Sequence, residues 1–381
     1  MKNLKKIALI SILLIGTSVL SACSISSESE GTGPTGNIFF SADKGNSWNL
    51  INSMPTIGEE SENISGVEVK GFYPDPSDSR AVYLATKENG LFYTYNISKG
   101  WNRANLNEAS LQSVAVSYEN KCLIYAAAKN KLYRTSDCSR SFSQVYYDTS
   151  TDILITDIVI DFYDPKNIYI ATSRGEVIKS IDRGESWRTI WRFEEPIAKL
   201  LLSPLDSRRI FIATENNKVY NFFSDSSTNT ENPNSLSKNF EATRFKDLND
   251  VLSDMEIGKR FINLRAAKNG DIYLATNKMI LKSPDDGTSW EKISLINSEK
   301  DSNILAMDIN PKNAKEIYYA SATTFFKSTD GGVTWNSKRL PTSWQSSDIM
   351  VDYHDGNNIY LGAERIPKDK NSGFLKIGRV N

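Results

Sequence analysis

Four aspartates recur in one short pattern and are the first residues of this chain that could do acid–base chemistry. The pattern reads Ser-x-Asp-x-Gly-x-Ser/Thr-Trp, and it places Asp43, Asp182, Asp285 and Asp330 in equivalent positions. In a hairpin turn an aspartate accepts hydrogen bonds from nearby backbone N–H groups, glycine supplies a positive φ, and tryptophan packs beneath. The pattern therefore predicts a structural turn rather than a set of catalytic carboxylates.

Six copies of this Ser-x-Asp turn are spread along the chain, and two of them are degenerate. The full copies comprise Ser41, Asp43, Gly45 and Trp48; Ser180, Asp182, Gly184 and Trp187; Ser283, Asp285, Gly287 and Trp290; and Ser328, Asp330, Gly332 and Trp335. In the degenerate copies Asn96 leads to Trp101, and Asp137 leads to Phe142. One unit has no copy, because a polar insertion over residues 224–239 replaces it.

Three cysteines offer a different chemistry. Cys23 follows a basic start, an apolar run and small residues, which is the layout of a secretory signal. If Lys129-Asn130 forms a two-residue hairpin loop, the strand register brings Cys122 next to Cys138. A disulfide between them suits an exported protein in oxidising surroundings, and two buried free thiols are the alternative.

The remaining composition argues against several classes of ligand. With the single histidine His354 and three cysteines, there is little material for a metal site, and we expect no metal and no cofactor. The 45 basic and 46 acidic side chains nearly balance, without a long basic run, so no nucleic-acid partner is expected. The sequence contains no Gly-rich phosphate loop and no nucleophile elbow.

The elements that must position these turns are repeated strands. A strand-forming sequence of an aliphatic, an aromatic, an apolar and a small residue recurs seven times. The small residues stand at Ala85, Ala127, Ala171, Ala213, Ala275, Ala320 and Gly362. Their spacing is 42 to 45 residues, except for the one interval of 62 that contains the polar insertion.

The strands and turns together resemble the Asp-box, or BNR, repeat of sialidases, sortilin-type receptors, xyloglucanases and photosystem II assembly-factor-like propellers. The resemblance implies an all-β chain that folds as a single seven-bladed β-propeller with four-stranded antiparallel blades. In these families the Asp-box turns lie on the face away from the active site.

Because a Ser-x-Asp turn precedes the first strand copy and none follows the last, the ring is expected to close between the two ends of the chain. The N-terminal hairpin near Ile38–Ile51 would join the strands near Asp348–Ala363. Phe374–Val380 would add a further strand to this blade, and the sequence leaves open which chain end supplies its third strand.

Leu20-Ser21-Ala22-Cys23 also resembles the lipobox of bacterial lipoproteins. The resemblance implies cleavage before Cys23 and attachment of lipid to its sulfur. We therefore expect a lipoprotein signal peptide over residues 1–22, a lipidated flexible tether over 23–36 and the propeller over 37–381. The protein would be anchored to a membrane of the bacterial cell envelope and face the periplasm or the cell exterior.

If the chain is an enzyme, a glycoside hydrolase is the expected class, because two of the resembling families cleave sugars. Arg365-Ile366-Pro367 resembles the Arg-Ile-Pro signature of sialidases, but it follows the last strand copy, whereas sialidases carry it before the first Asp-box. Xyloglucanases of this kind place their cleft between two propellers, and the repeats here suffice for only one.

Recognition is the function that remains. The loops from second to third strands, and those between blades, gather on one face of a propeller around its channel. We place there the candidate binding residues Glu59, Glu60, Glu62, Glu194, Glu195, Asp250, Asp254 and Trp344. Such loops suit a basic protein surface, a cation or a glycan.

The preferred hypothesis is a lipid-anchored, non-catalytic propeller that binds, or helps to assemble, another envelope or membrane protein. The alternative is a carbohydrate-active lipoprotein, either glycan-binding or a diverged sialidase- or xyloglucanase-type glycosidase.

Overall fold

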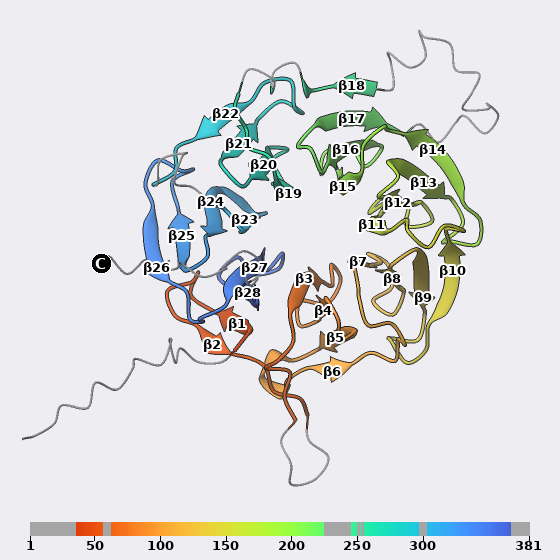
Figure 1. The fold of residues 1–381 in the computed structure, drawn as a ribbon, viewed down its shortest axis with the longest axis horizontal. Coiled ribbons are helices and arrows are strands. Elements are labelled where there is room, and N and C mark those ends of the chain that lie inside the picture. Colours follow the sequence, from red (N-terminus) through yellow and green to blue (C-terminus); the bar gives the residue numbers. More distant parts are fainter. Residues whose placement is uncertain are drawn as a thin grey trace, which may run out of the picture. The chain divides into compact units, whose positions relative to one another are not determined.

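The computed structural model describes residues 36–55, 62–224, 245–249, 252, 255–296 and 303–366. These residues form seven four-stranded antiparallel sheets arranged around a central axis (Figure 1). The predicted all-β, seven-bladed propeller is therefore confirmed. In the described part of the chain, no helix is long and apolar enough to cross a membrane.

The strands of each blade follow one another in sequence from the innermost to the outermost, except in the closing blade. The first three blades comprise β3 (Val69–Pro74), β4 (Val82–Thr86), β5 (Leu91–Thr94) and β6 (Asn102–Arg103); β7 (Ser113–Val116), β8 (Ile124–Ala128), β9 (Lys131–Thr135) and β10 (Ser143–Tyr147); and β11 (Ile155–Ile160), β12 (Ile168–Thr172), β13 (Glu176–Ser180) and β14 (Arg188–Arg192). The next three comprise β15 (Ile197–Leu202), β16 (Arg209–Thr214), β17 (Val219–Phe223) and β18 (Phe245–Asp247); β19 (Phe261–Ala266), β20 (Ile272–Thr276), β21 (Ile280–Ser283) and β22 (Glu291–Ile293); and β23 (Ala306–Asn310), β24 (Asn313–Ala320), β25 (Thr324–Ser328) and β26 (Asn336–Arg339). The closing blade comprises β27 (Gln345–Val351), β28 (Ile359–Glu364), β1 (Ile38–Ser41) and β2 (Asn49–Leu50).

The closing blade joins the two ends of the propeller, as predicted. Strand β1 pairs with β28 in antiparallel register, from Ile38 opposite Gly362 to Ser41 opposite Ile359. The N-terminal hairpin thus supplies both the third and the fourth strand of this blade, which settles the point that the sequence left open. Phe374–Val380 lies outside the described residues, as do Cys23 and the segments 1–22 and 23–35.

The second strand of each blade forms the centre of the core. In β4, β8 and β12 every residue is buried, because a blade is covered by a neighbour on each of its two faces. This explains the unbroken apolar runs that marked the strand repeat, since a strand covered on both sides has no need for alternation. The small residue of the repeat faces the next blade: a Cβ added at Gly362 would meet Val69 Cγ1 at 2.4 Å.

Seven clusters of buried apolar residues fill the spaces between neighbouring blades in the described part of the chain. One of them joins Met350 and Tyr360 of the closing blade to Phe72 and Leu84 of the blade after it. The core is therefore a ring of interfaces, and each blade depends on both of its neighbours.

Loss of a buried aromatic side chain from the closing blade should destabilise the propeller more than loss of an exposed side chain near it. We expect Phe39→Ala to lower the free energy of unfolding by about 3–5 kcal/mol, because Phe39 in β1 is 2% exposed and belongs to the cluster between the last two blades. Leu50→Ala in β2, where Leu50 is 43% exposed, should cost about 1 kcal/mol or less. Urea unfolding of both variants measures the difference. Equal unfolding midpoints would show that Phe39 does not stabilise the closing blade.

Candidate functional site

Alternating strand directions divide the loops between two faces of the ring. The loops from first to second strands share one face with the Ser-x-Asp turns, which we call the turn face. Backbone hydrogen bonds join these two sets of loops: Lys44 N donates to the Asn357 carbonyl, and Arg183 N donates to the Lys166 carbonyl. The loops from second to third strands and the connections between blades lie on the opposite face, which we call the linker face.

The aspartates of the Ser-x-Asp turns are fully engaged in holding their turns. Asp43 Oδ1 accepts hydrogen bonds from the Ser41 hydroxyl at 2.8 Å and from Ser47 N at 2.8 Å, and Oδ2 accepts one from the Ser47 hydroxyl at 2.6 Å. Gly45, at φ 78°, donates its N–H to the Ser41 hydroxyl. These bonds lower the pKa of Asp43 to about 2, with the Ser47 hydroxyl as the largest cause. Such a carboxylate is not a proton donor near neutral pH.

The same bonds recur at the other full copies. Asp182, Asp285 and Asp330 each accept from the serine or threonine four residues later through both its N–H and its hydroxyl. The structural interpretation of the pattern therefore fits all four carboxylates.

Tryptophans at the ends of three turns reach across to the preceding blade. Trp101 Nε1 donates to the Ile51 carbonyl at 2.6 Å, Trp187 Nε1 to the Val145 carbonyl at 3.0 Å and Trp335 Nε1 to the Ser294 carbonyl at 2.7 Å. Val145 belongs to the outermost strand of its blade, and Ile51 and Ser294 each follow one closely. These indoles tie the rims of neighbouring blades together.

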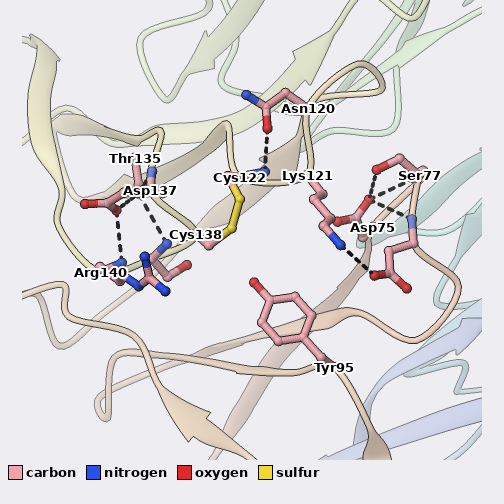
Figure 2. Close-up of a disulfide and its surroundings, with 12 residues drawn as sticks. Asp75, Ser77, Tyr95, Asn120, Lys121, Cys122, Thr135, Asp137, Cys138 and Arg140 are labelled. Carbon is pink, nitrogen blue, oxygen red and sulfur yellow. Dashed lines mark hydrogen bonds and ion pairs between the residues drawn. A yellow bond between two sulfur atoms is a disulfide. The ribbon is translucent and has the colours of Figure 1, made fainter.

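The degenerate turn at Asp137 carries a disulfide (Figure 2). Cys122 is bonded to Cys138, with their Cα atoms 4.0 Å apart. The register of β8 and β9 is the predicted one, with Ala128 opposite Lys131. Cys138 at φ 58° and the next residue at φ 67° adopt a conformation that only glycine enters freely, so the disulfide holds a turn in which glycine is missing.

The central channel is a concave site with charged side chains on its wall. A cavity of about 720 Å³ runs between the innermost strands of the blades. Three carboxylates and three cations of its wall belong to the innermost strands, and the sequence analysis did not single them out. They are Asp157, Asp308 and Asp348, together with Lys70, Lys199 and Arg265.

Each of the channel aspartates, Asp157, Asp308 and Asp348, accepts a backbone hydrogen bond from the innermost strand of the next blade. Asp157 Oδ2 accepts from Leu200 N at 2.9 Å, and Asp308 Oδ2 accepts from Val351 N at 2.8 Å. Asp348 Oδ2 accepts from Phe72 N at 2.8 Å, across the seam where the ring closes. These carboxylates therefore link neighbouring blades, and we call each such hydrogen-bonded link a clasp.

Two of the channel cations neutralise the charge of a clasp carboxylate. Lys199 Nζ lies 3.2 Å from Asp157 Oδ1, and Arg265 Nε donates to Asp308 Oδ1 at 2.8 Å. The Asp157 and Asp308 side chains are 3% and 7% exposed, and these cations offset the cost of burying each carboxylate.

Among the described residues no cation forms an ion pair with Asp348. Burial raises the pKa of Asp348 to about 6, and the nearby charge of Asp308 adds to the rise. Arg265, the N–H of Phe72 and Lys199 all act in the opposite direction. Asp348 is therefore expected to change its charge near pH 6.

In this arrangement the channel carboxylates are engaged by other groups of the protein and are poorly placed to act as a catalytic pair. A glycosidase needs one carboxyl group as acid and a second as base or nucleophile, with both free to meet the substrate. Here the channel aspartates are acceptors for neighbouring blades. Among the described residues, no group of three or more His, Cys, Asp or Glu side chains could hold a metal ion.

The predicted binding residues on the linker face are partly neutralised by neighbouring cations. Glu62 and Glu194 are exposed, and Glu195 forms an ion pair with Lys218. Trp344 is half-buried rather than exposed, with the Arg365 guanidinium 5.1 Å from its ring centre. The other predicted residues, Glu59, Glu60, Asp250 and Asp254, lie outside the described residues.

Arg365, which the sequence linked to a sialidase signature, makes local contacts. Its guanidinium donates to the Gly66 carbonyl at 3.2 Å and lies 3.7 Å from Glu68. With Trp344 beneath it, this arginine fastens the end of β28 to the connection that precedes β3.

The channel mouth at the turn face contains residues that sequence reasoning missed. A second hollow of about 660 Å³ opens there, and its lining includes Tyr118, Phe162, Pro204 and Tyr353. The available signal was the presence of large apolar residues in the polar loops that follow the innermost strands.

The sequence matches no protein-family model and is not detectably similar to any curated protein. Solved structures with a similar fold include the GH74 xyloglucanase of Xanthomonas campestris, with 13% identity and a TM-score of 0.61 over 78% of this chain and 51% of the enzyme. They also include YCF48 bound to D1 peptide, with 15% identity and a TM-score of 0.56 over 82% of this chain and 100% of YCF48. YCF48 from Cyanidioschyzon merolae gives 12% identity and a TM-score of 0.54 over 82% and 98%. The chain thus spans about half the length of the xyloglucanase, and these likenesses show the fold.

Removal of a channel aspartate should destabilise the ring far more than removal of a surface aspartate. Asp308→Ala leaves Arg265 and the N–H of Val351 without their acceptor, and we expect a loss of about 3–5 kcal/mol in the free energy of unfolding. Asp206→Ala, which breaks the surface pair with Arg208, should cost less than about 1 kcal/mol. Urea unfolding compares the two, and equal costs would mean that the clasp contributes nothing.

Asp348 should make the protein more stable in mild acid. Its folded pKa of about 6 lies above the usual 3.8, so the folded state disfavours the ionised form and loses stability as pH rises from 4 to 6. The gain at pH 5 over pH 7 should be on the order of 1 kcal/mol, and Asp348→Asn should abolish it. Asp43→Asn should retain it, because Asp43, with a pKa of about 2, titrates outside this window. Thermal melts at the two pH values test this, and an unchanged pH response in Asp348→Asn would contradict it.

Proposed function

We propose that this chain is a lipid-anchored, non-catalytic propeller that binds another protein of the bacterial envelope and helps to assemble it. The observation that carries the proposal is the state of the channel aspartates. All three accept backbone hydrogen bonds from a neighbouring blade, and two also contact a cation. Aspartates bound in this way hold the blades together. We therefore expect the loops at the two mouths of the channel to bind the partner.

The comparisons support a protein partner more than a sugar. The likeness to YCF48 extends over the whole of that chain, and that structure contains a bound peptide. The xyloglucanase is about twice as long as the region that this chain matches. A single ring with a mixed-charge channel therefore fits the binding of a polypeptide better than a cleft shared by two domains.

The sequence supports the location. The lipobox-like Leu20-Ser21-Ala22-Cys23 and the Ser/Gly/Glu-rich segment after it describe a tethered lipoprotein, and the Ser-x-Asp turns describe an Asp-box propeller. A disulfide between Cys122 and Cys138 suits an oxidising compartment. We therefore place the protein at the surface of an envelope membrane, where its partner would also reside.

One observation favours the carbohydrate-active alternative. The pKa of Asp348, about 6, lies in the range of a general acid, and the channel is wide enough for a small ligand. Against it stands the hydrogen bond from Phe72 N to this carboxylate. Xyloglucan oligosaccharides are therefore the appropriate competing probe.

In-cell photocrosslinking tests the proposal. A benzoylphenylalanine placed at Glu194 on the linker face or at Tyr163 on the turn face should yield a discrete protein adduct from at least one position, because recognition belongs to the mouths. Tyr147, which is 58% exposed on the outermost strand β10, serves as the matched rim position and should yield none. Cys23→Ser, which removes the expected anchor, should diminish the adduct.

The alternative makes the opposite prediction. If neither face gives a protein adduct while the purified chain binds or hydrolyses xyloglucan oligosaccharides, the assembly function is wrong. Loss of that sugar activity in Asp348→Asn would then assign the chemistry to the channel.

A further inference from the structure

The turn-face mouth of the channel exposes large apolar side chains from three consecutive blades. Tyr118, Phe162, Tyr163 and Leu205 are 43%, 36%, 87% and 65% exposed, and each lies in the loop between the first and second strand of its blade. Tyr118 and Phe162 contact each other edge to face, with ring centres 6.0 Å apart, at the edge of the hollow. Exposed apolar residues that cluster around a hollow, rather than standing singly, mark an interaction site.

The opposite side of the same mouth is basic. Lys268 comes from the first loop of the β19 blade, lines the hollow and lies 4.7 Å from the centre of the Tyr353 ring. Within the described residues its ammonium group is in no ion pair. Lys312, from the first loop of the β23 blade, is exposed and donates its ammonium proton to the His354 carbonyl, which carries no formal charge. The mouth therefore joins an apolar half to a side on which Lys268 presents a positive charge.

We propose that this mouth, formed by the apolar half and Lys268, docks a peptide segment of the partner that presents one large apolar side chain beside a carboxylate. The inference rests on the proposed function and adds the face and the chemistry of the segment. The apolar anchor would enter the hollow of about 660 Å³ between Tyr118, Phe162 and Pro204, and the carboxylate would pair with Lys268.

The shape of the mouth distinguishes a peptide from a membrane surface. A bilayer meets the outermost residues of a face and leaves a concave hollow unfilled, whereas a protruding side chain fills it. The mouth is also asymmetric, with Lys268 at the blade of β19 and the aromatic residues Tyr118 and Phe162 at the blades of β7 and β11. A short segment with two different neighbouring side chains matches such an asymmetric mouth.

The disulfide fixes one wall of the site before binding. Tyr118 lies in the loop between β7 and β8, and the same loop ends at Cys122, which is joined to Cys138 (Figure 2). Ser117 N donates to the Leu123 carbonyl and closes the loop from its other side. A loop held at both ends loses less freedom on binding, so reduction of the disulfide should weaken the complex.

Peptide selection tests the proposal with a defined probe. Twelve-residue peptides displayed on phage are panned on the full chain, and sequences that also bind the Tyr118→Ala/Phe162→Ala variant are removed. We expect the enriched peptides to carry an aromatic or large aliphatic residue within three positions of Asp or Glu. Synthetic copies should lose at least tenfold in affinity for the double variant and for Lys268→Glu, and several-fold on reduction of the disulfide.

Matched variants separate binding from folding. Tyr147→Ala removes an exposed tyrosine from the rim, and Lys259→Glu reverses an exposed lysine beside the linker-face mouth, so both should bind the peptides like the native chain. Thermal melts verify that all variants fold.

Three results would overturn the inference. In the first, the enriched peptides are basic or lack an apolar residue. In the second, the Tyr118→Ala/Phe162→Ala variant binds the enriched peptides as tightly as the native chain does. In the third, no peptide is enriched, and this double variant loses binding to phosphatidylglycerol vesicles or loses self-association. If one of these results is obtained and the crosslinker at Glu194 still gives a protein adduct, the proposed function holds and the binding site lies on the linker face. Absence of adducts from both faces would remove the function as well.

Discussion

Neighbouring blades share no strand pairing in the described part of the chain, so the ring depends on side chains that cross from one blade to the next. Most of the contact is apolar, and it lies in the seven clusters between the blades. Apolar contact is not directional, and it allows sheets to slide. The crossing hydrogen bonds supply direction: the channel aspartates fix the inner edges, and the indoles of Trp101, Trp187 and Trp335 fix the rims. The β1–β28 pairing then closes the ring with backbone hydrogen bonds.

This construction explains why the channel is charged and yet offers little reactivity. The innermost strands meet around the axis, where backbone N–H groups that face the preceding blade need acceptors. Aspartates provide them, and the cations Lys199 and Arg265 compensate the resulting buried charge. Polar groups bound in this way are not available to a substrate. The surfaces that differ from blade to blade are the loops, and the hollow lined by Tyr118 and Phe162 is one such surface with exposed apolar side chains.

The sequence predicted the features that rest on local patterns. The Ser-x-Asp turns, the strand repeat, the closure between the chain ends and the register around Lys129-Asn130 all follow from short-range spacing and turn chemistry. The channel aspartates escaped notice because no common motif surrounds them. Asp157 and Asp348 occupy equivalent positions opposite Ala171 and Gly362, but Asp308 stands opposite Tyr318, so the three aspartates do not recur at one position of the repeat. The ion pair of Glu195 on the linker face was not predicted either, since its partner Lys218 comes from another loop.

Hydrogen exchange of single amides is the most direct measurement of the central claim that the channel aspartates hold neighbouring blades together. In the native chain, the N–H groups of Leu200, Val351 and Phe72 should be among the slowly exchanging amides of the innermost strands. Asp157→Ala should accelerate exchange at Leu200 far more than at Val351, because only the first amide loses its acceptor. Unchanged protection at Leu200 in that variant, or equal acceleration around the whole ring, would contradict a blade-to-blade clasp.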